Sequence, residues 1–266
     1  MSWRASNERA GRTDFVLIVA VASAFLISIV FSMFGQGGGS VYTPTLFLLG
    51  YAALVSVSTS LMLNLVTALF STLVYYRQRL VDLRLASAFV PGIVVGSFLG
   101  GALGNFADTG LLMWLFVAFL VGAGARMVYT YWEKAPSEAA PSRTSLLMYG
   151  VIGIFSFGVG VLSGLLGVGG GILIVPFLIF VYGVPTKLSA GTTGFVVIFS
   201  SLFGVLGHSA FGHLDYGLAL PAVVAVAAGG VLGARFMVKT SAKWVKTGFG
   251  LLMFAFAIQL VVKLIG

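Results

Sequence analysis

The feature that most constrains this chain is a run of 62 residues, Phe15–Tyr76, without Asp, Glu, Lys, Arg or His. Two more runs are nearly as long: Leu85–Ala125 holds one charged residue, Asp108, and Thr144–Thr186 holds none. A helix needs about 20 apolar residues to cross a bilayer core of about 30 Å. Strands of a membrane barrel would alternate polar and apolar residues, which these runs do not. The runs therefore predict an all-α, polytopic membrane protein.

The composition supports this class and excludes others. Hydrophobic residues make up 59% of the 266 residues and charged residues only 8%, whereas a soluble domain carries roughly 25% charged residues. The chain has no cysteine, which excludes disulfides and thiolate metal sites. The charge of +8 comes from basic residues at the ends of apolar runs, where they set membrane orientation, so we expect no nucleic-acid partner. We expect no metal, no cofactor and no enzymatic activity, because no P-loop or intramembrane protease motif is present.

Turn and breaker residues divide the long runs into ten apolar segments. The second and the seventh are too short to cross a bilayer alone, and each follows a cluster of glycines. The expected segments are 15–34, 41–55, 58–76, 85–104, 110–131, 146–166, 172–184, 188–207, 216–236 and 244–264.

The glycine clusters belong to an internal repeat. The pattern G-x-G-G-G-x-x-x-x-P occurs from Gly35 to Pro44 and again, 132 positions later, from Gly167 to Pro176. Further landmarks recur 133 positions apart, namely Asp82 with Asp215, Gly96 with Gly229 and Gly100 with Gly233. Shared landmarks in register indicate a duplication. The predicted organisation is a tail at 1–14, a first repeat at 15–131, a polar linker at 132–145 and a second repeat at 146–266.

The orientation of the two repeats follows from their segment number. Each repeat has five segments, and an odd number inverts the second repeat against the first. A parallel arrangement also remains open, since basic residues barely separate the two arrangements. Four basic residues between 235 and 246 favour the inverted arrangement, and three arginines before residue 14 favour the parallel one. We expect the inverted arrangement.

The glycine clusters are the best candidates for a binding site. Each glycine inside a helix costs about 1 kcal/mol relative to alanine, so the clusters predict breaks. Backbone freed in this way must be buried in protein or line a wet cavity. A short helix that starts after the break presents free N–H groups and the positive end of its dipole, which together bind anions. The alternative is close helix packing, the role expected for Gly96, Gly100, Gly229 and Gly233.

Hydroxyl and amide side chains near the clusters complete the candidate site. Serines and threonines before the expected third and eighth segments either cap those helices or donate to an anion. Gln36 and Asn64 either bond across helices or, Gln36 above all, contact a ligand. The candidate substrate-binding residues are Gln36, Gly37, Gly38, Gly39, Ser58, Thr59, Ser60, Gly169, Gly170, Gly171, Thr192 and Thr193, with Gly35, Pro44, Gly167 and Pro176 as the structural frame.

Other polar residues receive structural interpretations. Asp82 and Asp215 are expected to cap helices. His208 and His213 match no metal-ligand spacing and are expected in a loop or at the interface. All seven carboxylates lie at segment ends, in connections or in tails, so no proton relay is expected inside the membrane.

The paired glycine motifs on two halves of about 130 residues resemble the TauE/SafE family of sulfite exporters. The similarity is strongest at Gly35–Leu49 and Leu165–Thr193 and extends over most of 15–264. The resemblance implies a secondary carrier, an exporter, for small sulfur-containing anions such as sulfite, sulfoacetate or other organosulfonates. It also implies a multi-pass protein of a bacterial inner membrane. A passive anion channel, an import carrier for a related anion and a membrane scaffold are the alternatives.

Overall fold

The computed structural model describes residues 2–104, 106–132, 146–209, 216–239, 254–255, 257–262 and 264–265. In these ranges the chain forms nine α-helices and no strand. They are α1 (Ser2–Ser32), α2 (Gly39–Leu48), α3 (Ala53–Arg77), α4 (Leu83–Gly104), α5 (Thr109–Trp132), α6 (Leu146–Leu166), α7 (Gly171–Tyr182), α8 (Thr186–Ser209) and α9 (Tyr216–Lys239). Six of them, α1, α3, α4, α6, α8 and α9, are long and apolar enough to cross a bilayer. The all-α, polytopic membrane protein is confirmed.

Two regions of the predicted organisation lie mostly outside the described residues. Apart from Trp132, the linker at 132–145 is not described, and neither is most of the tenth expected segment at 244–264. The division into two repeats with a linker therefore stays a prediction.

Several helix starts differ from the sequence-based expectation, and α1 differs most, because it begins at Ser2 rather than at 15 and so includes most of the expected tail. The third helix begins at Ala53 rather than at 58, and the eighth begins at Thr186 rather than at 188. Gly50, with a φ of 100°, turns the chain after α2, and no breaker follows before Arg77. The helix therefore takes in the polar residues that follow its start. Capping by Ser58, Thr59, Ser60, Thr192 and Thr193 is wrong, because all five lie inside helices.

The short helices α2 and α7 each fold back on the helix before them. Ala20 of α1 packs with Leu46 of α2, while Phe31 packs with Val41, so the two helices run antiparallel. In the second hairpin the ring of Phe155 on α6 stacks on Phe177 of α7, with centroids 3.9 Å apart. Each glycine cluster is thus the tip of a helical hairpin.

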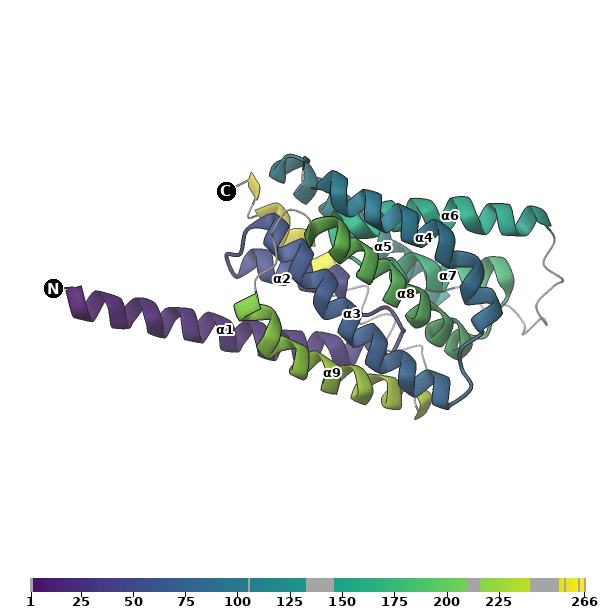
Figure 1. Ribbon diagram of the computed structural model, residues 1–266, viewed down its shortest axis with the longest axis horizontal. Coiled ribbons are helices and arrows are strands. Elements are labelled where there is room, and N and C mark those ends of the chain that lie inside the picture. The colour runs from purple at the N-terminus through teal and green to yellow at the C-terminus, as the bar shows by residue number, and fades with distance from the viewer. Residues whose placement is uncertain are drawn as a thin grey trace.

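The long helices surround these hairpins in a matched arrangement. In Figure 1, α3 and α8 cross the middle of the bundle, α1 and α9 lie along one flank, and α4 and α6 lie along the other. Helices α3 and α8 run antiparallel, because Leu61 approaches Gly204 and Thr72 approaches Gly194. An antiparallel relation between the third helix of each half supports the inverted arrangement over the parallel one. The repeat and its orientation in a membrane stay predictions.

Glycines allow the flanking helices to approach closely. A Cβ added to Gly96 or Gly100 of α4 would overlap backbone oxygens of α6, at Phe157 and Val161. The expected packing role is confirmed on the other flank too, where a Cβ on Gly233 of α9 would overlap the carbonyl oxygen of Ile29. Small residues of this kind bring membrane helices together.

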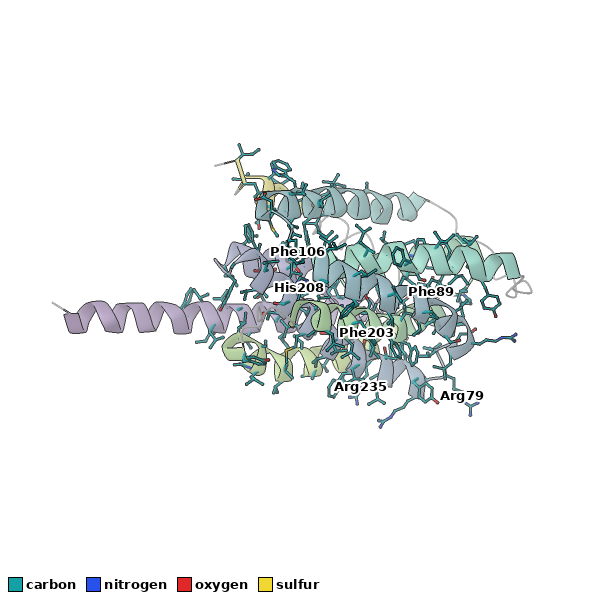
Figure 2. The ribbon with its side chains drawn as sticks, turned by 45° about the horizontal axis from the view of Figure 1, so that its top comes forward. Arg79, Phe89, Phe106, Phe203, His208 and Arg235 are labelled. Carbon is teal, nitrogen blue, oxygen red and sulfur yellow. The ribbon has the colours of Figure 1, made fainter. Side chains whose placement is uncertain are left out.

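Charged side chains gather at one end of the bundle. This is the end where α3 and α9 finish and α4 and α8 begin, and Lys187 donates from Nζ to the carbonyl of Val238 there at 2.7 Å. Figure 2 shows Arg79 and Arg235 on this side of the molecule, away from Phe106 and His208. The six basic residues at this end are Arg77, Arg79, Arg84, Lys187, Arg235 and Lys239.

The opposite end of the bundle carries few charged side chains after the first residues of the chain. Between residues 15 and 239, as far as they are described, it carries one charged side chain, Asp108. The start of α1 extends from that end and adds three arginines and two acids. Because cytoplasmic loops carry excess Lys and Arg, we expect the basic end to face the cytoplasm.

We predict that Gly164→Ala destabilises the protein and that Gly158→Ala, in the same helix, does not. A Cβ at Gly164 would overlap the Ser97 carbonyl oxygen and lie 2.5 Å from the Gly101 nitrogen, whereas nothing lies within 4 Å of one at Gly158. Overpacking costs about 1–3 kcal/mol. Thermal unfolding of both variants in detergent measures the difference, and equal midpoints would show that α4 and α6 pack more loosely than described.

We predict that single cysteines at Gln78 and Tyr216 report opposite sides of the membrane. Gln78 follows α3 at the basic end, and Tyr216 begins α9 at the other end. Since the chain has no native cysteine, a membrane-impermeant thiol reagent added to intact cells should label Tyr216→Cys and spare Gln78→Cys. In the repeat, Tyr216 corresponds to Leu83, which follows Gln78 closely in the sequence. Parallel repeats place corresponding positions on the same side of the membrane, so equal labelling of Tyr216→Cys and Gln78→Cys would establish parallel repeats.

Candidate site where the glycine clusters meet

The glycine clusters reverse the chain in a conformation that other residues rarely adopt. Gly35, Gly37 and Gly38 have φ values of 64°, 81° and 152°, and in the second cluster Gly169 and Gly170 have values of 78° and 76°. Glycine reaches such positive φ values without steric cost, because it lacks a Cβ. The clusters are therefore breaks in the helices, as expected, and each ends where a short helix begins.

The two breaks lie against each other at the centre of the bundle. A Cβ on Gly39 would lie 2.7 Å from the carbonyl group of Val168, and one on Gly171 would lie 2.7 Å from the Cα of Gln36. The segments 36–39 and 168–171 are thus in backbone contact, although 132 positions separate them. The glycines permit close packing as well as a break, so both interpretations of the clusters hold for this region.

Asn64, halfway along α3, lies between both clusters. A Cβ on either Gly37 or Gly169 would overlap its carboxamide group. Its Oδ1 accepts a hydrogen bond from the N–H of Gly39 at 3.0 Å, and its Nδ2 donates to Ser201 Oγ on α8 at 2.7 Å. The side chain is fully buried. Asn64 therefore joins both clusters, α3 and α8 at one point.

Ser60 holds the two breaks together from the same face of α3. Its hydroxyl lies 3.2 Å from the carbonyl oxygen of Gly39 and 3.0 Å from that of Gly167. Thr43 adds a third link, since its hydroxyl donates to the Leu166 carbonyl at 3.2 Å. Carbonyl groups freed by the breaks thus find donors inside the protein, which a lipid environment requires.

The ends of the two long hairpin helices are held by a matched pair of side chains. Tyr75 of α3 donates from its hydroxyl to the carbonyls of Ser32 and Met33, each at 2.8 Å. His208, 133 positions after Tyr75, lies in α8 with Nε2 2.9 Å from the Gly164 carbonyl. The expectation that His208 sits in a loop or at the interface is wrong. It is fully buried, because α8 extends beyond it and its ring contacts a carbonyl at the end of α6. His213 lies outside the described residues.

The remaining candidate residues fall into two groups. Ser58 donates to the Leu54 carbonyl of its own helix, and Thr192 accepts the backbone N–H of Asp82 at 3.0 Å, which fixes the turn before α4. The structure brings neither to the point where the clusters meet. In the second group, Thr59, Thr193 and both amide atoms of Gln36 are buried without a hydrogen-bond partner among the described residues. As expected, Asp82 caps α4, through Oδ1 and the N–H of Leu85.

Several buried polar residues near the clusters were not among the candidates. Ser201 bonds Asn64, and Thr72 is buried with an unpaired hydroxyl among the described residues. Ser200 joins Ser163 at 2.6 Å and Ser97 at 3.0 Å, so that hydroxyls connect α8 with α6 and α4. Serine and threonine are frequent in membrane helices, and their spacing alone does not separate these residues from others.

No buried charge accompanies these polar groups. Among the side chains that the structure describes, no Asp, Glu, Lys or Arg is buried. Groups of three or more potential metal ligands are also absent from the described residues. Any ligand at the clusters would be bound by amides, hydroxyls and backbone N–H groups.

Broken helical hairpins that meet in the middle of a membrane-spanning bundle, around buried polar groups, define a class of protein: the multi-pass membrane transporters. The sequence model of the family described as Sulfite exporter TauE/SafE matches residues 20–260. The chain belongs to this family and is a membrane transporter.

Known relatives are similar along most of their length. The chain is 28% identical to "Probable membrane transporter protein YunE" of Bacillus subtilis, over 86% of this chain and 91% of the relative. It is 27% identical to a "Probable membrane transporter protein" of Xylella fastidiosa, with 92% and 95% covered. A relative in Methanocaldococcus jannaschii, "Probable membrane transporter protein MJ0441", is 27% identical, with 73% and 74% covered. No solved structure matches the chain significantly.

We predict that Ser60→Ala destabilises the protein while Thr193→Val, its counterpart in the other half, does not. Ser60→Ala leaves two buried carbonyls without their donor, which costs about 1–3 kcal/mol. Thr193→Val removes a hydroxyl that has no partner among the described residues and keeps the side-chain shape. Thermal unfolding of the ligand-free protein compares the two. A larger loss for Thr193→Val would mean that the Thr193 hydroxyl has a structural partner.

Proposed function

We propose that this transporter is a secondary carrier that exports small sulfur-containing anions, such as sulfite or an organosulfonate, from the cytoplasm across a bacterial inner membrane. The observation that carries the proposal is the meeting of two glycine breaks, each followed by a helix N-terminus, at a buried point without charged side chains. The name of the family supports the class of substrate.

The geometry suits a small oxyanion for electrostatic reasons. Helix N-termini carry about half a positive charge and free N–H groups, which bind anions without a basic side chain. A site made of such dipoles binds an anion without fixing it through a full opposite charge, and release on the other side remains feasible. Six basic residues at the cytoplasmic end raise the local concentration of anions there.

Export needs no coupling residue inside the membrane. In a cell with a negative interior, an outgoing anion gains about 2.3 kcal/mol per charge at 100 mV. This corresponds to a ratio of roughly 50 between the two sides at equilibrium. Asp82 and Asp108 cap helices outside the bundle centre, and Glu8 and Asp14 belong to the start of α1. The potential alone is therefore a sufficient driving force.

We predict that flux of labelled sulfite in liposomes follows an imposed potential. A potassium gradient with valinomycin sets the potential, and empty liposomes are the control. Asp82→Asn should leave the pH dependence unchanged, because asparagine also caps helices well. Flux that ignores the potential but stops without a proton or sodium gradient would refute this mechanism.

The same liposomes separate a carrier from a passive anion channel. A carrier saturates with substrate and exchanges internal for external labelled sulfite at zero net potential. Conduction that rises linearly with concentration, without exchange, would assign the channel function instead. Accumulation of labelled sulfite on the negative side of the membrane would assign the import function.

A further inference from the structure

The two halves of the site differ at the position of Asn64, and the difference bears on where a ligand can bind. In the first half, the N–H of Gly39 at the start of α2 is bonded to the Oδ1 of Asn64. The counterpart of Asn64 at a displacement of 133 is Val197, whose Cγ2 lies 3.1 Å from a Cβ built on Gly171, at the start of α7. A valine cannot accept a hydrogen bond, so the start of α7 lacks the acceptor that the start of α2 has.

The N-terminus of α7 is left open in the described structure. Gly170 is the N-cap residue of this helix of 12 residues and Gly171 begins it, and the N-cap glycine has no side chain that could cap the helix. No backbone carbonyl among the described residues outside the helix itself accepts a hydrogen bond from Gly170, Gly171 or Ile172, and no described side chain takes the place that Asn64 has at Gly39. These groups point to a missing acceptor, as buried N–H groups are nearly always paired.

Gln36 lies unpaired against this helix start, and two unpaired threonine hydroxyls lie on the neighbouring helices α8 and α3. Gln36 is only 2% exposed, both of its amide atoms lack partners among the described residues, and its Cα and Cβ lie 2.7 and 3.2 Å from the Cβ position of Gly171. Thr193 lies one helical turn before Val197 on the same face of α8, and its hydroxyl is also unpaired there. Thr72 Oγ1 lies 2.6 Å from the Cβ position of Gly194, next to Thr193.

The equivalent positions around the start of α2 carry no such unpaired group. Gln36 corresponds to Val168 and Thr72 to Val205, both apolar, while Thr193 corresponds to Ser60, whose hydroxyl is bonded to two carbonyls. At these three pairs of positions, the unpaired groups are therefore all on the side of α7. They lie toward the cytoplasmic end, since Thr72 and Gly194 are nearer than Asn64 to the end of α3 at Arg77.

We propose that the carrier has a single anion subsite, at the N-terminus of α7, formed by the free N–H groups there together with Gln36, Thr193 and Thr72. The Asn64 carboxamide occupies the equivalent place at the N-terminus of α2 and acts as a built-in substitute for the anion. The proposal rests on the proposed function for the class of ligand, an oxyanion bound by neutral donors. One anion per turnover, bound nearer the cytoplasm, is the consequence for transport.

The decisive variant is Val197→Asn, which places in the second half the acceptor that Asn64 supplies in the first. It should raise the unfolding temperature of the ligand-free protein, because the new carboxamide caps α7. It should also lower the affinity for labelled sulfite, measured by equilibrium binding, by roughly 10- to 100-fold, as the ligand loses hydrogen bonds to a charged group. Val197→Leu is the matched control, because leucine has nearly the shape of asparagine but no hydrogen-bond acceptor. This variant should not raise the unfolding temperature.

Two further variants locate the site independently. Gln36→Leu should weaken sulfite binding by roughly 10-fold without lowering the unfolding temperature. Asn64→Leu, where it folds, should retain binding. Wild-type affinity in a folded Val197→Asn protein would overturn the proposal, as would equal losses of affinity in Val197→Asn and Val197→Leu.

A panel of anions distinguishes a failure of the proposed subsite from a failure of the proposed function. Sulfite, sulfoacetate, sulfate, chloride and acetate are tested on the native protein and on Val197→Asn. If the native protein binds only an anion without sulfur and Val197→Asn loses it, the subsite stands and the proposed substrate class fails. If sulfite binds the native protein and Val197→Asn equally, the substrate class stands and the subsite fails. If the native protein binds none of the five anions, both fail.

Discussion

The hydrogen bonds of Asn64 are the interaction on which the centre of this transporter depends. Two helical hairpins end in glycine breaks inside an apolar bundle, and each break frees backbone groups that lipid cannot satisfy. Asn64 satisfies the N–H of Gly39 and is tied to α8 through Ser201, while Ser60 satisfies carbonyls of both breaks. Without these side chains the breaks would leave several unpaired groups in a medium of low dielectric constant.

The surrounding helices make this arrangement possible by close approach. Glycines on α4, α6 and α9 bring the flanking helices into backbone contact, and Tyr75 and His208 hold the ends of α1 and α6 beside the breaks. These contacts recur in both halves at displacements of 132 or 133 positions. The predicted repeat thus carries a centre in which the two halves are chemically unequal. The difference between Asn64 and Val197 places the proposed subsite at α7 rather than at α2.

Much of the fold could be predicted from residue patterns. The charge-free runs, the two short helices after the glycines and the packing role of Gly96, Gly100 and Gly233 follow from hydropathy and from the cost of glycine in helices. The starts of α3 and α8 could not be predicted well, because serine and threonine fit both a helix interior and a cap. His208 was misplaced for a related reason, since a polar residue near a segment end gives no sign of whether its partner is lipid headgroup or backbone.

The sequence by itself determined that the chain is a helical membrane protein, that two glycine breaks interrupt it, and that no cysteine or intramembrane carboxylate can take part. These properties follow from composition and local backbone preference, which act over a few residues. Only the tertiary structure decided that the breaks touch, that Asn64 joins them, and that Gln36, Thr193 and Thr72 are buried with no partner among the described residues. These relations connect residues far apart in the sequence, 25 positions for Gly39 and Asn64 and 137 for Asn64 and Ser201, and no local preference encodes such a contact.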